Sequence, residues 1–343
     1  MGYITEYERY RIETMLKDGL KPCQVAKRLG RHFTTIYNEI ERGTVVFRNY
    51  DWTDRKEYCA DVAQRKADEK KANKGRDLKI GRDFELAAHI EHLIGDLHYS
   101  PYAVEQDIRK SGRFKTTLCK GTIYNYIDKG VFLNISNKNL YSKRSKKKQD
   151  HEKIERPSYK KLKGKSIEER AKEIDTREDH GHWEMDTVYS GKDTSKSCLL
   201  VMTERKTRDE YLIKMPDRTL NSTLKALNNL ERVLGYETFC KRFKTITVDN
   251  GSEFGDSTGI ETSCIHPGRK RTEVYFCHPG ASCERGSNEN ANKLVRHWIP
   301  KGQDIGQYSD DDIQKIQDWI NDYPRALFNG LSTNEYKREL GIC

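Results

Sequence analysis

The chain has 343 residues, which is enough for two or three domains of ordinary size. Its formal net charge is +10, and its hydrophobic and charged fractions are nearly equal at 35% and 34%. No apolar run reaches the ~18 residues of a membrane-spanning helix and no apolar signal segment opens the chain, so membrane and secreted classes are not expected. The nine cysteines are scattered and form no Cys-x-x-Cys pair, which is typical of a reducing compartment, and we expect a cytoplasmic protein.

Three short helices are predicted at the N-terminus. Thr5 can cap the first helix, residues 21–29 form a second that Gly30 closes, and residues 33–42 form a third. Two short helices followed across a glycine turn by a third indicate a helix-turn-helix, although a helical domain that does not bind DNA shows the same pattern. The polar residues that the third helix would present to DNA are Thr34, Thr35, Tyr37 and Asn38.

Two more helical regions are predicted before residue 131. Residues 54–73 are rich in charge and in alanine, which favours one long helix. A second helical module spans about 83–130, and the Ser-Pro at its centre is a strong signal for the start of a helix. The string Thr-Ile-Tyr-Asn occurs at both 35–38 and 122–125, which suggests two helix-turn-helix units built alike.

The positive charge is concentrated in one segment. Residues 138–165 contain 12 Lys and Arg against 3 Asp and Glu, which is +9 of the net charge. Such a run suits contact with DNA phosphates, whose affinity comes from counterion release, but a solvated linker explains it equally well. The phosphate contacts predicted here are Lys143, Arg144, Lys146, Lys147, Lys148, Lys160, Lys161 and Lys163.

From about residue 180 the pattern becomes that of an α/β domain. Three strands, a helix, two strands and a helix follow one another, which is the order of the ribonuclease-H-like fold. The predicted strands are 183–189, 197–203, 210–215, 243–248 and 274–277, and the predicted helices are 219–234, 287–299 and 310–322.

The predicted fold class is therefore an α/β ribonuclease-H-like catalytic domain of the retroviral-integrase type, preceded by all-α helix-turn-helix modules. The expected domains are an N-terminal helix-turn-helix (1–50), a helical connector (51–82), a second helix-turn-helix (83–133), a basic linker (134–179), the catalytic domain (180–302) and a C-terminal helical segment (303–343).

Three carboxylates are candidates for catalysis. Asp186 and Asp249 each end a predicted strand, where the sites of α/β sheets collect, and Glu289 lies in the helix that follows. Such a triad can hold two divalent metals ~3.5–4 Å apart, an arrangement that promotes in-line phosphoryl displacement. Asp249 precedes Asn-Gly, so a role in a turn is the alternative for that residue. Together with the helix-turn-helix patterns and the basic segment, the triad indicates an enzyme that cuts and joins DNA.

Two glutamates compete for the third position. Glu284 precedes a glycine and is expected in a loop, whereas Glu289 lies inside the predicted helix. An acid that shares a helix face with basic and amide side chains suits a metal beside a phosphate, so Glu289 is preferred. The residues on that face are Asn292, Lys293 and Arg296.

The cysteines offer a second possible metal site. Cys264, His266, Cys277 and Cys283 lie close enough in the sequence to raise a zinc site. Their spacing matches no standard zinc template, so such a site is not expected.

Three strings give a more specific comparison. They are Gly-His-Trp-Glu-Met-Asp (181–186), Asp-Asn-Gly-Ser-Glu-Phe (249–254) and Glu-Arg-Gly-Ser-Asn-Glu-Asn-Ala-Asn-Lys-Leu-Val-Arg (284–296). They resemble bacterial insertion-sequence transposases of the Asp-Asp-Glu class, and within it the IS-thirty family. Members of that family also open with a helix-turn-helix, carry a second one and show Ser-Pro…Thr-Ile-Tyr before the catalytic domain. The likeness covers nearly the whole chain, and an insertion within 255–272 would explain the longer spacing between the second aspartate and the glutamate.

The resemblance implies a DNA transposase that binds the inverted repeats at the ends of its element and acts on the nucleoid of a bacterial cell. It makes Asp186, Asp249 and Glu289 the ligands of two Mg²⁺ ions, for which Mn²⁺ can substitute. Its partners would be double-stranded DNA, at the element ends and the target, and further copies of the same chain. A DNA-binding regulator with a non-catalytic domain of this fold, or another nuclease of this fold, is the alternative.

Overall fold

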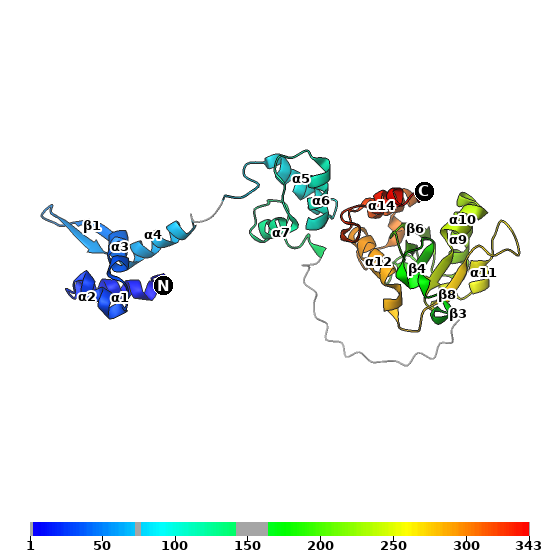
Figure 1. Ribbon diagram of the computed structural model, residues 1–343, viewed down its shortest axis with the longest axis horizontal. Coiled ribbons are helices and arrows are strands. Elements are labelled where there is room, and N and C mark those ends of the chain that lie inside the picture. Colours follow the sequence, from blue (N-terminus) through cyan, green and yellow to red (C-terminus); the bar gives the residue numbers. More distant parts are fainter. Residues whose placement is uncertain (1–2, 73–76, 142–163, 343) are drawn as a thin grey trace. The chain divides into compact units, whose positions relative to one another are not determined.

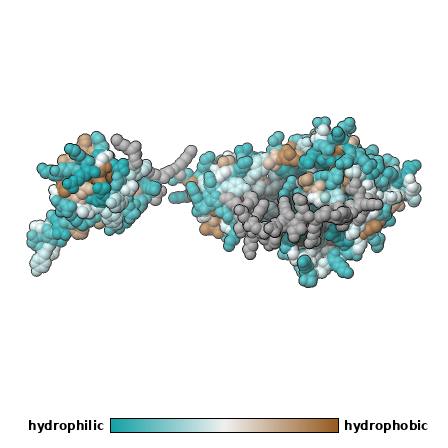
Figure 2. Space-filling view, turned by 90° about the horizontal axis from the view of Figure 1, so that it is seen from below, coloured by the Kyte–Doolittle hydropathy of each residue, from teal (hydrophilic) through white to brown (hydrophobic). Residues whose placement is uncertain are grey.

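The computed structural model describes residues 3–72, 77–141 and 164–342, and the chain divides into two compact units, Met1–Gly81 and Arg82–Cys343 (Figure 1). The eight basic residues predicted at DNA phosphates, from Lys143 to Lys163, lie outside the described residues. Within the described ranges, no helix combines the length and the apolar character needed to cross a membrane. The visible face of each unit is mainly hydrophilic, with small hydrophobic areas among the polar side chains (Figure 2).

The N-terminal unit begins with the three helices that the sequence predicts, α1 (Glu6–Lys17), α2 (Pro22–Leu29) and α3 (Phe33–Gly43). Thr5 caps α1, because its side chain accepts an N–H of the first turn in a capping box. Gly30 ends α2 with φ of 63°, a left-handed conformation that glycine adopts without strain. Apolar residues of all three helices meet in one core, as their spacing predicts.

The segment after α3 departs from the prediction. An antiparallel hairpin of β1 (Thr44–Arg48) and β2 (Asp54–Tyr58) precedes helix α4 (Ala60–Ala72), so the helix predicted over 54–73 is wrong for its first residues. Valines and a threonine favour an extended β1, and Asp51 Oδ1 accepts the N–H of Thr53 at 3.1 Å in the turn. The charged residues of β2 resemble an exposed helix on their own, but pairing with β1 determines their conformation.

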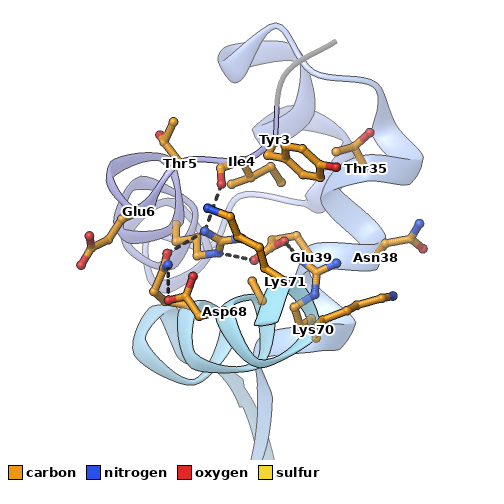
Figure 3. Close-up of a pocket in the computed structure, with 14 residues that line it drawn as sticks. Tyr3, Ile4, Thr5, Glu6, Thr35, Asn38, Glu39, Asp68, Lys70 and Lys71 are labelled. Carbon is orange, nitrogen blue, oxygen red and sulfur yellow. Dashed lines mark hydrogen bonds and ion pairs between the residues drawn. The ribbon is translucent and has the colours of Figure 1, made fainter. Parts of the chain in front are cut away.

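Helix α4 packs against α1 and α3 and contributes to the N-terminal core. Arg9 Nε lies 2.6 Å from Glu39 Oε1 of α3, and Arg9 Nη1 donates to Gln64 Oε1 of α4 at 2.7 Å. Because both partners compensate the buried guanidinium, this ion pair ties the three helices together. Figure 3 shows Glu39 at the wall of a pocket of about 550 Å³, which Thr35 and Asn38 of α3 also line.

The second unit also begins with three helices, α5 (Phe84–Gly95), α6 (Pro101–Ser111) and α7 (Lys120–Asp128), which confirms the helices predicted within 83–130. Ser100 caps α6 directly before the proline, and its Oγ accepts the N–H of the third helical residue at 3.3 Å. The repeated Thr-Ile-Tyr-Asn begins at the third residue of both α3 and α7, and its isoleucine is buried in each. The two modules therefore use this string in the same way.

The rest of the second unit is built on a six-stranded sheet of order β3-β8-β7-β4-β5-β6. Strand β5 is antiparallel to both β4 and β6, whereas β7 runs parallel to β4 and β8 parallel to β7. All five predicted strands are present, and β3 is a further short strand beside β8. Their bounds are β3 (Lys165–Ser166), β4 (His182–Tyr189), β5 (Cys198–Glu204), β6 (Glu210–Met215), β7 (Thr245–Val248) and β8 (Glu273–Phe276).

Helices cover both faces of this sheet, so that it separates two cores (Figure 1). One face carries α9 (Leu220–Leu234), α10 (Tyr236–Arg242) and α11 (Ser257–Glu261), and the other carries α12 (Gly286–Trp298) and α13 (Asp310–Asp322). The remaining helices are α8 (Glu173–Thr176) and α14 (Thr333–Glu339).

Strand β4 contributes side chains to both cores. Trp183 and Met185 belong to the core under α9, and Val188 belongs to the core under α12. Because side chains alternate along a strand, Asp186 points toward the face that carries α12. A mixed sheet of this order with helices on both faces is the ribonuclease-H-like fold that the sequence predicts.

Candidate active site

Asp186 and Asp249 lie at the same level on neighbouring strands. Glu184 of β4 is in register with Thr247 of β7, and two residues further along the same register brings Asp186 level with Asp249, just past the end of β7. Each carboxylate accepts a hydrogen bond from the main chain. The N–H of Thr187 donates to Asp186 Oδ1 at 2.9 Å, and the N–H of Gly251 donates to Asp249 Oδ1 at 2.8 Å. A Cβ at position 251 would lie 2.4 Å from Glu253 Oε2 and 2.8 Å from Asp249 Oδ1, so a larger residue there would displace both carboxylates.

The two carboxylates converge on one guanidinium. Arg285 Nη1 lies 3.2 Å from Asp186 Oδ1, and Arg285 Nη2 lies 3.1 Å from Asp249 Oδ2. Arg285 is only 8% exposed, and its Nη1 also donates to the carbonyl oxygen of Met185 at 3.0 Å. Burial lowers the pKa of Arg285, but the two carboxylates outweigh burial and raise it. This edge of the sheet therefore directs two negative charges at one cation.

Helix α12 is fixed to the sheet beside these carboxylates by Asn288 and Glu184. The N–H of Asn288 donates to Glu184 Oε2 at 2.9 Å, and Asn288 Nδ2 donates to the carbonyl oxygens of Glu184 and Val201 at 3.1 and 3.0 Å. Glu184 is fully buried and lies 3.5 Å from Arg205 Nε. Because these bonds join α12 to both β4 and β5, they set the position of the helix that carries Glu289.

Glu289 lies on the face of α12 that contacts the aspartates. Asn292 follows it by three residues and donates from Nδ2 to Asp186 Oδ2 at 3.0 Å, and residues at this spacing share one face of a helix. Arg285, which contacts both aspartates, lies directly before the first residue of α12. The Glu289 side chain is exposed, and the described residues include no group of three His, Cys, Asp or Glu that could hold a metal ion. The structure thus brings Asp186 and Asp249 together and places Glu289 on their side of α12 without grouping all three.

Glu284, the alternative third acid, is engaged with His278. The N–H of His278 donates to Glu284 Oε2 at 2.9 Å, and His278 Nδ1 lies 2.7 Å from Glu284 Oε1. The hydrogen bond to Glu284 raises the pKa of His278. Burial raises the pKa of Glu284, but the bonds from His278 lower it more. Glu284 therefore stabilises the turn before α12.

Glu253, the glutamate of the string 249–254, joins the turn after β7 to strand β4. Thr187 Oγ1 donates to Glu253 Oε1 at 2.8 Å, and Arg218 Nε lies 2.6 Å from the same oxygen. Burial raises the pKa of Glu253, but its hydrogen bonds, first that from Arg218, lower it more. The Arg218 guanidinium also lies 5.6 Å from the centre of the exposed Tyr189 ring.

The two basic residues predicted on α12 have different surroundings. Lys293 is exposed, and its Nζ donates to Asn290 Oδ1 at 3.0 Å. Arg296 is half-buried and donates to the carbonyl oxygens of Tyr189 at 3.2 Å and Ile299 at 3.4 Å, and burial lowers its pKa. Arg296 therefore links the C-terminal end of α12 to the end of β4.

The residues predicted for DNA recognition share the outer face of α3. Thr34, Tyr37 and Asn38 are exposed and Thr35 is partly exposed, whereas Ile36 between them is fully buried. Helical spacing produces this division, since buried and exposed residues fall on opposite faces.

The cysteines considered for zinc have other contacts. Cys264 Sγ donates to the carbonyl oxygen of Asn228 at 3.5 Å, and Cys277 is buried directly after β8. His266 packs edge-on against the ring of Tyr236. In the part of the chain that the structure describes, these residues form no metal-binding group.

Sequence reasoning missed Arg285, Glu184 and Glu253. One signal was available for Glu184, because it lies two residues before Asp186 and strand alternation places both on one face. The role of Arg285 had no such signal, since its two partners come from strands 36 and 99 residues earlier in the chain.

Known proteins and protein families match both units of the chain. The family Integrase core domain matches residues 176–281, and the family Helix-turn-helix domain matches residues 2–43. A probable transposase for insertion-like sequence element IS1161 of Streptococcus salivarius is 32% identical over 95% of this chain and 91% of that protein. The transposase for insertion sequence element IS4351 of Bacteroides fragilis is 29% identical over 98% of this chain and 96% of that protein. The transposase InsI for insertion sequence element IS30A of Escherichia coli (strain K12) is 25% identical over 98% and 83%.

Among solved structures, the simian T-cell lymphotropic virus intasome in complex with PP2A regulatory subunit B56 gamma matches 46% of this chain and 53% of that chain. The TM-score is 0.35 and the identity 14%, which is too low to bear on the family assignment.

A helix-turn-helix ahead of an integrase core with paired aspartates defines a class, the DNA-cutting and DNA-joining recombinases of the Asp-Asp-Glu type. Within that class the chain belongs to the IS-thirty (IS30) family of insertion-sequence transposases. It is therefore an enzyme of DNA transposition, and neither a non-catalytic regulator nor another nuclease of the fold is favoured. An integrase core implies dependence on a divalent metal. The hard carboxylate oxygens of Asp186 and Asp249, directed at one cation, fit such an ion.

Proposed function

We propose that Asp186, Asp249 and Glu289 hold two Mg²⁺ ions, or Mn²⁺ in their place, and that the chain uses them to cleave and join DNA at the ends of its own element. The observation that supports this is the convergence of the Asp186 and Asp249 carboxylates on one positive group. Glu289 completes the proposed set because Asn292, three residues further along α12, donates to Asp186, and Arg285, directly before the helix, contacts both aspartates. When bound, the metal pair would activate a water or a 3′-hydroxyl and stabilise the leaving oxygen.

The chain's own residues prepare the carboxylates for this task. The Asn292 amide and a main-chain N–H each bind one oxygen of Asp186, and the N–H of Gly251 binds one oxygen of Asp249. These bonds fix the orientation of both carboxylates, so the carboxylates themselves need little reorganisation to bind a cation. The hydrogen bonds between Asn288 and Glu184 fix the position of α12, and therefore of Glu289, relative to the sheet.

DNA recognition is proposed to lie in the helical modules. The exposed face of α3, with Thr34, Thr35, Tyr37 and Asn38, would enter a major groove at the inverted repeats. The basic residues between Lys143 and Lys163 would contact phosphates without regard to sequence. Asn292, Lys293 and Arg296 would lie near the cleaved strand. Because an element has two ends, we propose that several copies assemble on DNA, in the bacterial cytoplasm and on the nucleoid.

The proposal is tested with the isosteric variants Asp186→Asn, Asp249→Asn and Glu289→Gln on oligonucleotides that carry an element end. Each should lose strand cleavage and joining while binding the oligonucleotide nearly as wild type does, because each removes charge and little shape. Glu284→Gln is the matched control and should retain cleavage, since Glu284 bonds to His278. Full cleavage by Glu289→Gln beside an inactive Glu284→Gln would assign the third position to the other acid, and robust cleavage in EDTA would exclude metal dependence.

A further inference from the structure

Arg285 is the one cation recorded in contact with both Asp186 and Asp249 within the described part of the chain. Two carboxylates this close repel each other unless a positive charge lies between them. The Arg285 Nη1 and Nη2 atoms supply that charge at 3.2 and 3.1 Å, in a setting where only 8% of the residue is exposed to solvent. The guanidinium thus satisfies the same oxygens that a divalent cation would need.

A guanidinium and a divalent cation cannot both occupy this position. Two positive groups a few ångströms apart repel each other, and both would need the same carboxylate oxygens. The guanidinium is also incompletely bonded, because its Nε is buried without a partner. Its remaining hydrogen bond is to the carbonyl oxygen of Met185, a neutral acceptor that binds a guanidinium less strongly than a carboxylate does.

We propose that Arg285 is an internal substitute for the metal: in the metal-free protein it occupies the cation position between Asp186 and Asp249, and metal binds only by displacing it. This inference rests on the proposed function, because it takes the two aspartates as metal ligands. Arg285 acts in two opposite ways. It stabilises the metal-free site by neutralising the paired carboxylates, and it weakens the affinity of the free protein for metal.

Binding of Mn²⁺ to the full-length protein, measured by calorimetry or by loss of the free-ion electron-spin resonance signal, tests this. Arg285→Gln should bind Mn²⁺ at least about tenfold more tightly than wild type, because the competing charge is gone while the side chain stays long and polar. Arg285→Lys should fall between the two, since an ammonium retains charge but lacks the two-pronged geometry of the guanidinium.

Arg296→Gln is the matched control. It removes one positive charge from α12, the helix that follows Arg285, and the hydrogen bonds of the Arg296 guanidinium are to main-chain carbonyl oxygens. Its Mn²⁺ affinity should change by less than about threefold, which separates displacement at the site from the general effect of net charge.

Thermal unfolding provides a second readout that does not depend on catalysis. In EDTA, Arg285→Gln should unfold at a lower temperature than wild type, because the carboxylates are left unneutralised. Saturating Mn²⁺ should raise its unfolding temperature by more than it raises that of wild type. If Arg285→Gln does not fold, Arg285→Lys provides the same two comparisons.

Mn²⁺ affinity of Arg285→Gln equal to or weaker than that of wild type would overturn the inference, because Arg285 would then be a scaffold for the site. Asp249→Asn distinguishes this outcome from failure of the proposed function. If Asp249→Asn abolishes Mn²⁺ binding while Arg285→Gln leaves it unchanged, only the displacement is wrong. If Asp249→Asn binds Mn²⁺ as wild type does, the metal site itself lies elsewhere.

Discussion

Replacing Asn288 with alanine should loosen α12 from the sheet and thereby reduce catalysis. The Asn288 amide nitrogen donates to two main-chain carbonyl oxygens at 3.0 and 3.1 Å, and the residue is 1% exposed. Alanine removes both bonds and leaves the buried carbonyl groups underbonded, which should cost roughly 2–4 kcal/mol in the free energy of unfolding. The amide oxygen makes no hydrogen bond that alanine would remove, because it is buried without a partner. Since Glu289 is the next residue, strand transfer should fall as well, while DNA binding stays unchanged.

The assay is urea unfolding of the full-length chain, followed by tryptophan fluorescence. Three of the four tryptophans, Trp183, Trp298 and Trp319, lie in the second unit and report on the sheet and its helices. Asn290→Ala is the matched control, because Asn290 is exposed on the same helix and its recorded bond is to Lys293; its stability should stay within ~0.5 kcal/mol of wild type. Equal unfolding midpoints for Asn288→Ala and Asn290→Ala would refute the view that these bonds anchor α12.

Three further predictions concern α12, DNA recognition and pH. In single-turnover reactions, Arg296→Ala should remain folded and reduce the rate of strand transfer at least about tenfold, which is equivalent to ~1.4 kcal/mol of activation barrier. Wild-type rates would mean that Arg296 has only a structural role, through its bonds with Tyr189 and Ile299. In competition binding, changing Thr34, Thr35 and Asn38 together to alanine should remove the preference for element-end DNA over random DNA, and the affinity for random DNA should change little. If the preference is unchanged, the element ends are recognised outside α3. Glu284 raises the pKa of His278. The pair therefore stabilises the folded state fully below the ordinary histidine pKa of ~6.5, and this stabilisation is lost as the pH rises through the higher pKa of the folded state. Hydrogen exchange at residues 277–285, corrected for its intrinsic pH dependence, should accelerate over that range in wild type, and His278→Gln should show no such change.

The fold could be predicted largely from local pattern. The helices at α1, α2 and α3 follow from caps and glycine stops that act within a few residues, and the sheet strands follow from short apolar runs. The hairpin at 44–58 could not be predicted in this way, because β2 carries too few apolar residues to signal a strand. Its conformation depends on the partner strand, and that dependence is not visible in a window along the chain.

Only part of the active site could be predicted from the sequence. Asp249 follows the end of β7, as the apolar run before it predicts, but the prediction that Asp186 ends a strand is wrong, because β4 continues to Tyr189. The register of β4 with β7 brings the two aspartates level. Arg285 joins them through contacts between segments far apart in the chain, so no spacing rule could identify it. For Glu289, helical periodicity indicates the face of α12 but not the distance to the aspartates, which depends on how the helix packs.

The most direct test of the central claim, that Asp186 and Asp249 bind the metal, is a change of ligand chemistry at Asp249. Asp249→Cys replaces a hard carboxylate with a thiolate, which Mg²⁺ accepts poorly and Mn²⁺ tolerates better. Cleavage of element-end DNA by this variant should be lost in Mg²⁺ and partly restored in Mn²⁺, whereas wild type should cleave with either ion. Equal loss of cleavage in both ions, or full activity in Mg²⁺, would contradict coordination by Asp249.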